Sequence, residues 1–248
     1  MYINTTGIVL RETAYKESSK ILTVLTGGEG KLTVMARGAL RKNSKLAAAT
    51  QLLVFSELTL FSSRDRWTLT EARSVEQFRG LRDDIALLAL GSYFAEVTEA
   101  VADEDSPGGD LLPLLLNSLF ALSEGIKARE YVKPAFELRL MAASGFEPLL
   151  EGCAACGLEY PDEAELDLTG GTLNCRVHAP AGGAALGRGA LEAARYILGC
   201  EQKKLFSFKL SSDALRELSA ASEGYLLTQL ERRFRTLDYY KLVSALYV

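Results

Sequence analysis

The sequence is poor in the features that mark membrane, secreted and histidine-dependent catalytic proteins. It has one histidine, one tryptophan and four cysteines in 248 residues. No apolar run approaches the ~20 residues that span a bilayer, because the most apolar stretch, 85–93, contains Gly91 and is soon followed by Glu96 and Glu99. The N-terminal residues also lack the basic segment and apolar core of a secretory signal. We therefore expect a cytoplasmic protein.

Motifs for nucleotide hydrolysis and cofactor binding are lacking as well. The sequence contains neither Gly-x-x-x-x-Gly-Lys-Ser/Thr, whose loop holds phosphates, nor Gly-x-Gly-x-x-Gly between a strand and a helix. The single histidine, His178, stands close to cysteines, so a Ser-His-Asp or Cys-His catalytic group would compete with a metal for it. These absences favour a binding protein over an enzyme and predict no catalytic residues.

Charge is distributed unevenly along the chain, although the net charge is only −4. Residues 1–80 contain 12 Lys and Arg against 7 Asp and Glu, whereas residues 81–248 contain 16 against 25. The first part thus carries a net charge of +5 and the second part −9. Such an asymmetry indicates that the two parts meet different partners.

The first eighty residues have the pattern of a small β-barrel. Glycines at 27, 28 and 30 supply the positive φ that a hairpin turn needs. Five strands in this length predict an OB-fold for residues 1–80, with an SH3-like barrel as the alternative. The strands are short, rich in β-branched residues and partly alternating, and we expect them at 7–10, 20–26, 31–37, 53–61 and 67–72.

From about residue 81 the apolar residues recur at the three- and four-residue spacing of helices. Gly145 is placed to end one helix, and Ser211 or Ser212 to begin another. The fold class that follows is an α+β multidomain protein, with an N-terminal OB-fold β-barrel and a helical domain over 81–150 and 183–248. The expected helices lie at 85–97, 111–122, 130–144, 189–198, 211–221 and 223–234.

Three of the four cysteines and the histidine form two pairs. Two residues separate Cys153 from Cys156, two separate Cys175 from His178, and eighteen residues intervene between the pairs. This spacing lets four side chains point at one tetrahedral ion, as in a zinc ribbon. We predict that these four residues bind a structural zinc ion in a zinc-ribbon insert over 151–182.

Other interpretations of the cysteines stay open. In one, the thiols are free and buried. In another, two of them form a disulfide, and a cytoplasmic setting disfavours this bond. A catalytic zinc would need an open coordination position and an activating acid, for which Glu151 is the nearby candidate. The fourth cysteine, Cys200, lies outside the paired spacing and is expected to be a small buried apolar residue.

A stretch without acidic residues runs from Gly30 to Ser56. Small residues in this stretch let a phosphate approach the backbone, and clustered cations gain free energy by releasing counterions from a polyanion. The pattern predicts nucleic-acid binding; the alternative is a solvated loop that only keeps the protein soluble. The cations concerned are Lys31, Arg37, Arg41, Lys42 and Lys45.

Aromatic residues in the first eighty positions are candidates for stacking on bases. Alternation assigns most of them to the barrel core, so they add little support. They are Tyr2, Tyr15, Phe55, Phe61, Trp67 and Phe78.

Several segments, in this order along the chain, resemble the bacterial RecO family. They include KILT at 20–23, GKL at 30–32, ARGA at 36–39, FELRL at 136–140, GFEP at 145–148, the cysteine pair followed by Gly157, and FSF at 206–208. The resemblance implies an N-terminal OB-fold, a helical domain and a zinc-binding insert. It also implies a mediator of recombinational DNA repair that works in the cytoplasm, at the nucleoid.

The resemblance further implies partners and site residues. Members of the family bind single- and double-stranded DNA, anneal complementary strands, and with RecR help to load RecA on DNA coated by single-strand-binding protein. Carried over by position, the resemblance implies that the five cations bind DNA. It also implies that the two Cys/His pairs bind zinc. Zinc-binding members commonly have a fourth cysteine where this chain has His178, so Cys200 is the other candidate for that ligand.

Two rival functions remain at this point. One is a zinc-containing protein-interaction adaptor without DNA binding, in which the helices and the insert hold partners. The other is a zinc-dependent hydrolase or deaminase, which would keep its fold but lose activity on chelation.

Overall fold

The computed structural model describes residues 1–64, 66–104, 108–159, 161 and 163–246. The chain divides into two compact units. The first consists of Met1–Glu124 with Phe234–Val248, and the second of Gly125–Arg233. Among the described helices, none is both long and apolar enough to cross a membrane.

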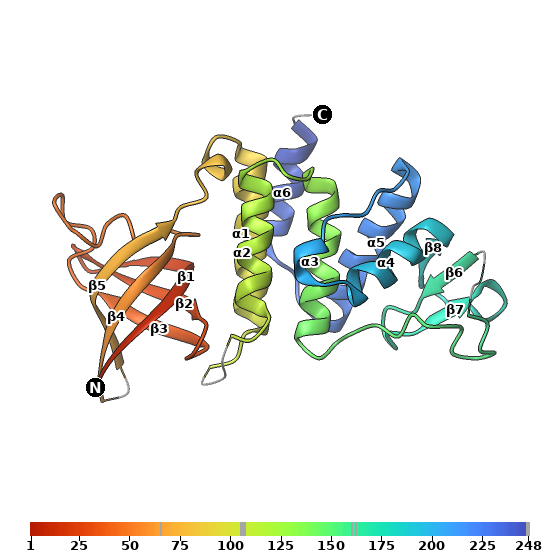
Figure 1. Ribbon diagram of the computed structural model, residues 1–248, viewed down its shortest axis with the longest axis horizontal. Helices are drawn as coiled ribbons and strands as arrows, with labels where there is room; N and C mark the ends of the chain where they lie inside the picture. Colours follow the sequence, from red (N-terminus) through yellow and green to blue (C-terminus); the bar gives the residue numbers. More distant parts are fainter. Residues whose placement is uncertain (65, 105–107, 160, 162, 247–248) are drawn as a thin grey trace. The chain divides into compact units, whose positions relative to one another are not determined.

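A closed five-stranded barrel of the OB type begins the first unit (Figure 1). The strands follow the order β1-β2-β3-β5-β4 and close through β1 and β4. All neighbours are antiparallel except β3 and β5, which pair in parallel near Val34 and Trp67. The strands are β1 (Tyr2–Tyr15), β2 (Ser19–Thr26), β3 (Lys31–Ala36), β4 (Phe55–Ser63) and β5 (Arg66–Glu76).

The barrel closes over an apolar core. Alternating side chains point inward, and fully burying each Leu or Val contributes roughly 1.5–3 kcal/mol. The expected hairpin after β2 is confirmed, with Gly30 at a φ of 68°. β1 is longer than predicted at both ends, because residues 2–6 pair with β4 and residues 11–15 pair with β2. The core includes Val9, Leu22, Val24, Leu32, Val34, Leu58, Leu60 and Leu69.

Helices α1 (Ile85–Val101), α2 (Leu111–Ser123) and α6 (Arg235–Leu246) complete the first unit, after a short 3-10 turn, η1 (Arg79–Arg82). The Asp84 carboxylate accepts hydrogen bonds from the Ala86 and Leu87 backbone and so caps α1. The Tyr93 and Phe234 rings pack edge to face, 6.1 Å apart. These contacts hold α6, which the sequence did not predict, against α1.

The second unit contains α3 (Arg129–Ala143), α4 (Arg188–Gly199), α5 (Ser212–Gln229) and a short 3-10 turn, η3 (Gln202–Lys204). The predicted break near residue 222 is wrong, because α5 is continuous and Gly224 lies inside it. The predicted caps are confirmed: Ser211 accepts a hydrogen bond from the Ala214 backbone, and Gly145 follows α3 with a φ of 84°.

A three-stranded antiparallel sheet lies beside α4 and α5 in the second unit (Figure 1). β6 (Glu163–Leu166) is its central strand, flanked by β7 (Leu173–Cys175) and β8 (Ala184–Gly187). Gly171, at a φ of 66°, lies in the turn between β6 and β7. The 3-10 turn η2 (Arg176–His178) follows β7 directly and presents the histidine.

Candidate metal centre and nucleic-acid interface

The two predicted ligand pairs come together at one point of the second unit. Cys153 and Cys156 lie on the loop between α3 and β6, Cys175 ends β7, and His178 ends η2. Their donor atoms all lie within 4.8 Å of one another. Two cysteines, Cys153 and Cys175, are buried, whereas Cys156 and His178 are exposed. The cluster is therefore formed at the surface of the insert, with two ligands anchored in it.

Backbone hydrogen bonds shape the first pair into a tight turn. The Gly157 N–H donates to the Cys153 carbonyl at 2.8 Å, and the Cys153 N–H donates to the Leu158 carbonyl at 2.9 Å. Gly157 has a φ of 73°, a conformation that glycine adopts without strain. The Ala154 N–H donates to the Leu173 carbonyl at 2.8 Å, so the turn is tied to β7 and hence to the second pair.

The separations fit a tetrahedral ion. Zn–S bonds of about 2.3 Å and Zn–N bonds of about 2.0 Å place ligand atoms roughly 3.5–3.8 Å apart. The Cys156 and Cys175 sulfurs are 3.9 Å apart, and Nδ1 of His178 lies 3.7 Å from the Cys153 sulfur and 3.2 Å from the Cys175 sulfur. Four protein donors complete a tetrahedron, which is the composition of a structural site.

Hydrogen bonding inside the cluster perturbs the acidity of its members. A backbone hydrogen bond from Cys175 lowers the pKa of the Cys153 thiol to about 6. The imidazole of His178 lowers the pKa of Cys175, and the same contact raises the pKa of His178. A backbone hydrogen bond from Leu158 lowers the pKa of Cys156, but the Cys153 and Cys175 thiols and burial outweigh it, so that this pKa is raised. A thiolate is thus favoured at two of the three sulfurs.

The two other nominated residues lie apart from this arrangement. Cys200 follows α4 and is half-buried, with its sulfur 3.7 Å from the Ile197 carbonyl. Glu151 is exposed. Neither belongs to the donor group found among the described residues.

Four of the five predicted DNA-binding cations are exposed on one loop, which joins β3 to β4. Successive turns build this loop: Arg41 N–H donates to the Gly38 carbonyl, and Ser44 N–H to the Arg41 carbonyl. Within the described part of the chain, no acidic side chain forms a salt bridge with these cations. We call them the basic loop: Arg37, Arg41, Lys42 and Lys45.

Lys31 lies elsewhere. It begins β3, whereas Arg37 follows the end of that strand. Its ammonium donates to the Glu99 carbonyl at 3.0 Å, near the C-terminal end of α1, and its side chain is partly buried. The structure therefore does not bring Lys31 together with the basic loop.

The β1–β2 hairpin lies against the basic loop, and sequence reasoning did not nominate its lysine. The Leu40 N–H donates to the Ser18 carbonyl at 3.0 Å, which joins the loop to the hairpin. The Lys16 ammonium lies 5.4 Å from the ring centroid of Tyr15, and that ring is 39% exposed. The first loop of an OB-fold commonly contacts oligonucleotides. Lys16 is missed because Glu17 follows it, so its charge does not stand out in the sequence.

The aromatic residues divide between the surface and the interior. Tyr2 is 67% exposed and packs on Phe61, with ring centroids 4.8 Å apart. Phe78 is buried. Tyr15 is therefore an aromatic residue exposed beside the basic loop, and the expectation that most of the six lie in the core does not hold for Tyr2 and Tyr15.

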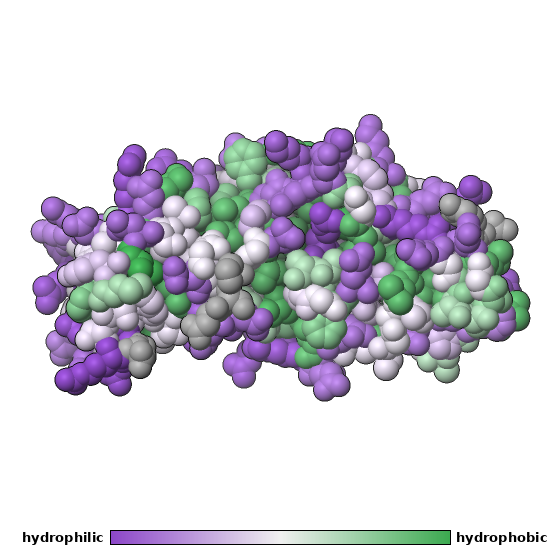
Figure 2. Space-filling view, turned by 60° about the horizontal axis from the view of Figure 1, so that its bottom comes forward, coloured by the Kyte–Doolittle hydropathy of each residue, from purple (hydrophilic) through white to green (hydrophobic). Residues whose placement is uncertain are grey.

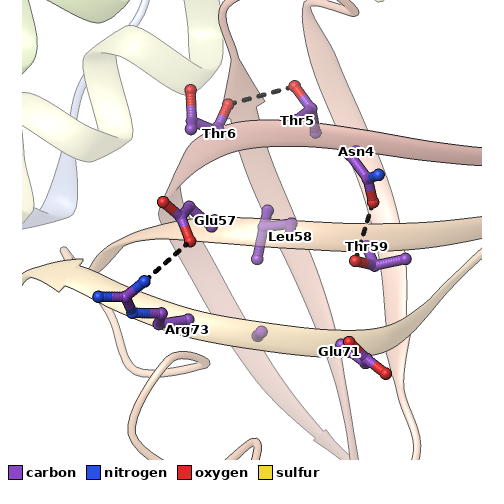
Figure 3. A pocket seen from close by; sticks show the side chains of 9 residues that line it. Asn4, Thr5, Thr6, Glu57, Leu58, Thr59, Glu71 and Arg73 are labelled. Atoms are coloured by element: carbon purple, nitrogen blue, oxygen red, sulfur yellow. Dashed lines mark hydrogen bonds and ion pairs between the residues drawn. The ribbon is translucent and has the colours of Figure 1, made fainter.

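A polar groove of about 710 Å³ crosses the outer face of β1, β4 and β5 (Figure 3). Arg73 pairs with Glu57 at 3.8 Å, and Glu71 adds a second carboxylate. Asn4 and Thr59 are hydrogen-bonded across the strands. A phosphate here would meet more negative than positive charge, so this groove is a poor nucleic-acid site.

Two family models match successive parts of the chain. A family model described as "Recombination protein O N terminal" matches residues 1–78, and one described as "Recombination protein O C terminal" matches residues 82–238. The chain belongs to the RecO family. The family assignment made from the sequence is thereby confirmed, and members of the family are named for recombination and DNA repair.

Curated relatives in the RecO family match along nearly the whole chain. The DNA repair protein RecO of Acetivibrio thermocellus is 31% identical over 245 residues, which cover 98% of each chain. That of Symbiobacterium thermophilum is 34% identical over 241 residues and 95% of each chain. The Bacillus pumilus protein is 38% identical over 157 residues, 63% of this chain and 61% of its own.

Proposed function

We propose that this chain is a recombination mediator that binds single- and double-stranded DNA through the basic loop. In this proposal it anneals complementary strands and, with RecR, helps to load RecA on DNA coated by single-strand-binding protein. It acts in the cytoplasm, at the nucleoid. The observation that carries the proposal is an exposed loop of four cations, without acidic partners in the described chain, on an OB-type barrel.

Annealing by such a surface requires no covalent chemistry. Two DNA strands repel each other through their phosphates, and a cationic loop that neutralises both lowers this repulsion. Base pairing then supplies the driving force. The proposal accordingly assigns no catalytic residue.

Lys31 has a reduced part in this proposal. Its ammonium is engaged with the Glu99 carbonyl, and it lies at the opposite end of β3 from Arg37. We propose that Lys31 contributes long-range attraction, while the basic loop and Lys16 make the direct phosphate contacts.

We further propose that the cysteine and histidine cluster holds a structural zinc ion. Three sulfurs and one imidazole nitrogen form a donor set that zinc prefers, and their separations fit a tetrahedron. Bound zinc would fix the turn at 153–157 against β7. No reaction step is assigned to it.

The test is a titration of fluorescein-labelled single-stranded DNA, followed by fluorescence anisotropy. Replacing all four basic-loop cations by alanine is expected to weaken binding at least a hundredfold at moderate salt, since each lost phosphate contact removes counterion release. Annealing of complementary labelled strands should slow in parallel. The matched control removes four exposed cations of the second unit: Arg188, Lys203, Lys209 and Arg216.

Two results would decide against DNA binding by this surface. If the control variant lost as much affinity as the loop variant, the binding would reflect net charge alone. If the native chain bound no DNA at low salt, the adaptor function would take the place of the mediator function.

A further inference from the structure

A second groove, of about 800 Å³, lies in the second unit beside the turn at 153–157. Its walls are the segment 147–152, this turn, and the C-terminal end of α4. Leu149 lines the groove and is 66% exposed, so it offers apolar surface to a partner. Figure 2 shows hydrophobic surface, bordered by hydrophilic surface, over the part of the molecule that contains β6 and β7.

The rim of this groove is acidic. Glu147, Glu151 and Glu159 line it, and all three are exposed. No described residue forms a salt bridge with their carboxylates. Arg195 is the one cation among the described lining residues, so the lining carries a net charge of about −2.

The guanidinium of Arg195 is already engaged by the backbone. It donates to the carbonyls of Leu150 at 2.7 Å, Glu151 at 2.9 Å and Glu159 at 2.7 Å. Arg195 thus fixes both sides of the groove from α4. An anion in the groove would face three exposed carboxylates and a guanidinium that already donates to three carbonyls.

Strand-like hydrogen bonds also hold the apolar wall in place. The Leu149 N–H donates to the Gly171 carbonyl at 2.7 Å, and the Leu173 N–H donates to the Leu149 carbonyl at 3.0 Å. Leu149 is therefore presented by ordered backbone. A preformed wall lowers the conformational entropy that this chain loses when a partner binds.

We propose that this groove is a docking site for a segment of a partner protein that carries Lys or Arg side chains beside a leucine-sized apolar one. The apolar side chain would cover Leu149, and the cations would face Glu147, Glu151 and Glu159. DNA is excluded by the same charges, so the site is separate from the basic loop and does not depend on the DNA-binding proposal.

The probe is a fluorescein-labelled peptide, Gly-Lys-Leu-Lys-Leu-Lys-Gly, titrated with the full chain and followed by anisotropy. The variant Glu147→Gln, Glu151→Gln, Glu159→Gln is expected to bind it roughly tenfold more weakly, since three exposed ion pairs are lost. Leu149→Ser, which keeps the backbone pairing, is expected to weaken binding about fivefold. Unchanged far-ultraviolet circular dichroism checks that each variant is folded.

The matched control is Glu130→Gln, Glu192→Gln, Glu201→Gln, which removes three exposed carboxylates elsewhere in the same unit. Its affinity for the probe should equal that of the native chain. Equal weakening in the control, or equal binding of a peptide with Glu in place of Lys, would overturn the proposal. DNA affinity should stay unchanged in all these variants, which separates a failure here from a failure of the basic loop.

A second copy of this chain is the competing occupant, because its own basic loop combines cations with Leu40, which is 44% exposed. Sedimentation velocity over a range of protein concentrations distinguishes self-association from binding of another protein. If the native chain stays monomeric, the result supports the proposal that a segment of another protein occupies the groove. Self-association that the triple glutamine variant abolishes would overturn the proposal in favour of contact between copies.

Discussion

The basic loop of the barrel and the cysteine turn of the insert are both irregular segments, but different forces hold them. The basic loop is fixed by small buried residues, among them Ala39, Ala49 and Thr50, which leave its cations free to face solvent. The cysteine turn is held by backbone hydrogen bonds within itself and to β7, and its donor side chains converge with those of Cys175 and His178. The cations of the first segment thus face solvent, whereas the donor side chains of the second face one another.

This difference predicts how each segment responds to loss of metal. Chelation, or Cys175→Ser, should remove amide hydrogen-exchange protection from residues 149–175, because structural zinc contributes on the order of 10–16 kcal/mol of binding free energy. Hydrogen exchange followed by mass spectrometry measures this directly. Protection of the barrel and affinity for DNA should not change.

Cys200→Ser is the control for that experiment. Cys200 lies apart from the donor group, so protection of the insert should be retained. If chelation left residues 149–175 as protected as before, the cluster would not be a structural metal site.

The interiors of the two units can be contrasted by one substitution. The buried polar side chains of the described barrel domain are uncharged, whereas the second unit buries Lys133, whose ammonium lies 2.8 Å from Glu137 and 2.9 Å from Glu223. Burial alone would lower the pKa of Lys133, but the two carboxylates raise it above its ordinary value. Lys133→Met should lower the free energy of unfolding by about 3–5 kcal/mol, since it leaves the buried Glu137 carboxylate without its cation.

Chemical denaturation of the full chain measures that loss. The control is Lys204→Met, which removes an exposed lysine 3.7 Å from Glu201 and should cost less than about 1 kcal/mol. Equal losses in the two variants would mean that the buried cluster does not stabilise the second unit.

A fall in pH should weaken zinc binding by the insert and leave DNA binding by the barrel unchanged. The metal binds thiolates and a neutral imidazole, so protons compete with it. In the metal-free protein Cys153 has a pKa of about 6, and the pKa values of Cys156 and His178 are raised. Protonation of those two groups begins at higher pH than usual, and Cys153 follows as the pH falls through 6.

Zinc affinity should therefore fall by at least about tenfold between pH 8 and pH 6, as measured by competition with a chromophoric chelator. DNA affinity should change little over the same range, because the basic-loop cations are lysines and arginines. A zinc affinity independent of pH would argue against thiolate ligands.

The smallest expected effect concerns Tyr15 and Lys16, which lie beside the basic loop. Tyr15→Ala and Lys16→Ala should each weaken single-stranded DNA binding by about three- to tenfold, since one stacking platform or one phosphate contact is lost. Tyr2→Ala is the control, an exposed aromatic residue on the Phe61 ring. A larger loss with Tyr2→Ala than with Tyr15→Ala would move the stacking site along β1.

Local patterns in the sequence predicted much of the fold. Alternation and glycines predicted five barrel strands, and the paired spacing predicted the donor group at Cys153, Cys156, Cys175 and His178. Both signals lie within short segments, where side-chain direction follows from backbone geometry. The capping roles of Ser211 and Gly145 were predictable for the same reason.

Features that depend on distant contacts were not predictable. α6 packs on α1 through Phe234 and Tyr93, although the two helices lie far apart in the sequence. The engagement of Lys31 depends on the Glu99 carbonyl, and the exposure of Tyr15 depends on where the hairpin ends. The acidic groove is formed by the segment 147–159 and the end of α4 together. No local sequence pattern predicts it.

The most direct test of the central claim is the salt dependence of single-stranded DNA binding by the native chain and by the basic-loop variant. Each phosphate contact contributes about −0.7 to the slope of log affinity against log salt concentration. Removing four contacts should flatten the slope by about 2.8, while the second-unit control keeps the native slope. An unchanged slope in the basic-loop variant would contradict the assignment of DNA binding to this loop.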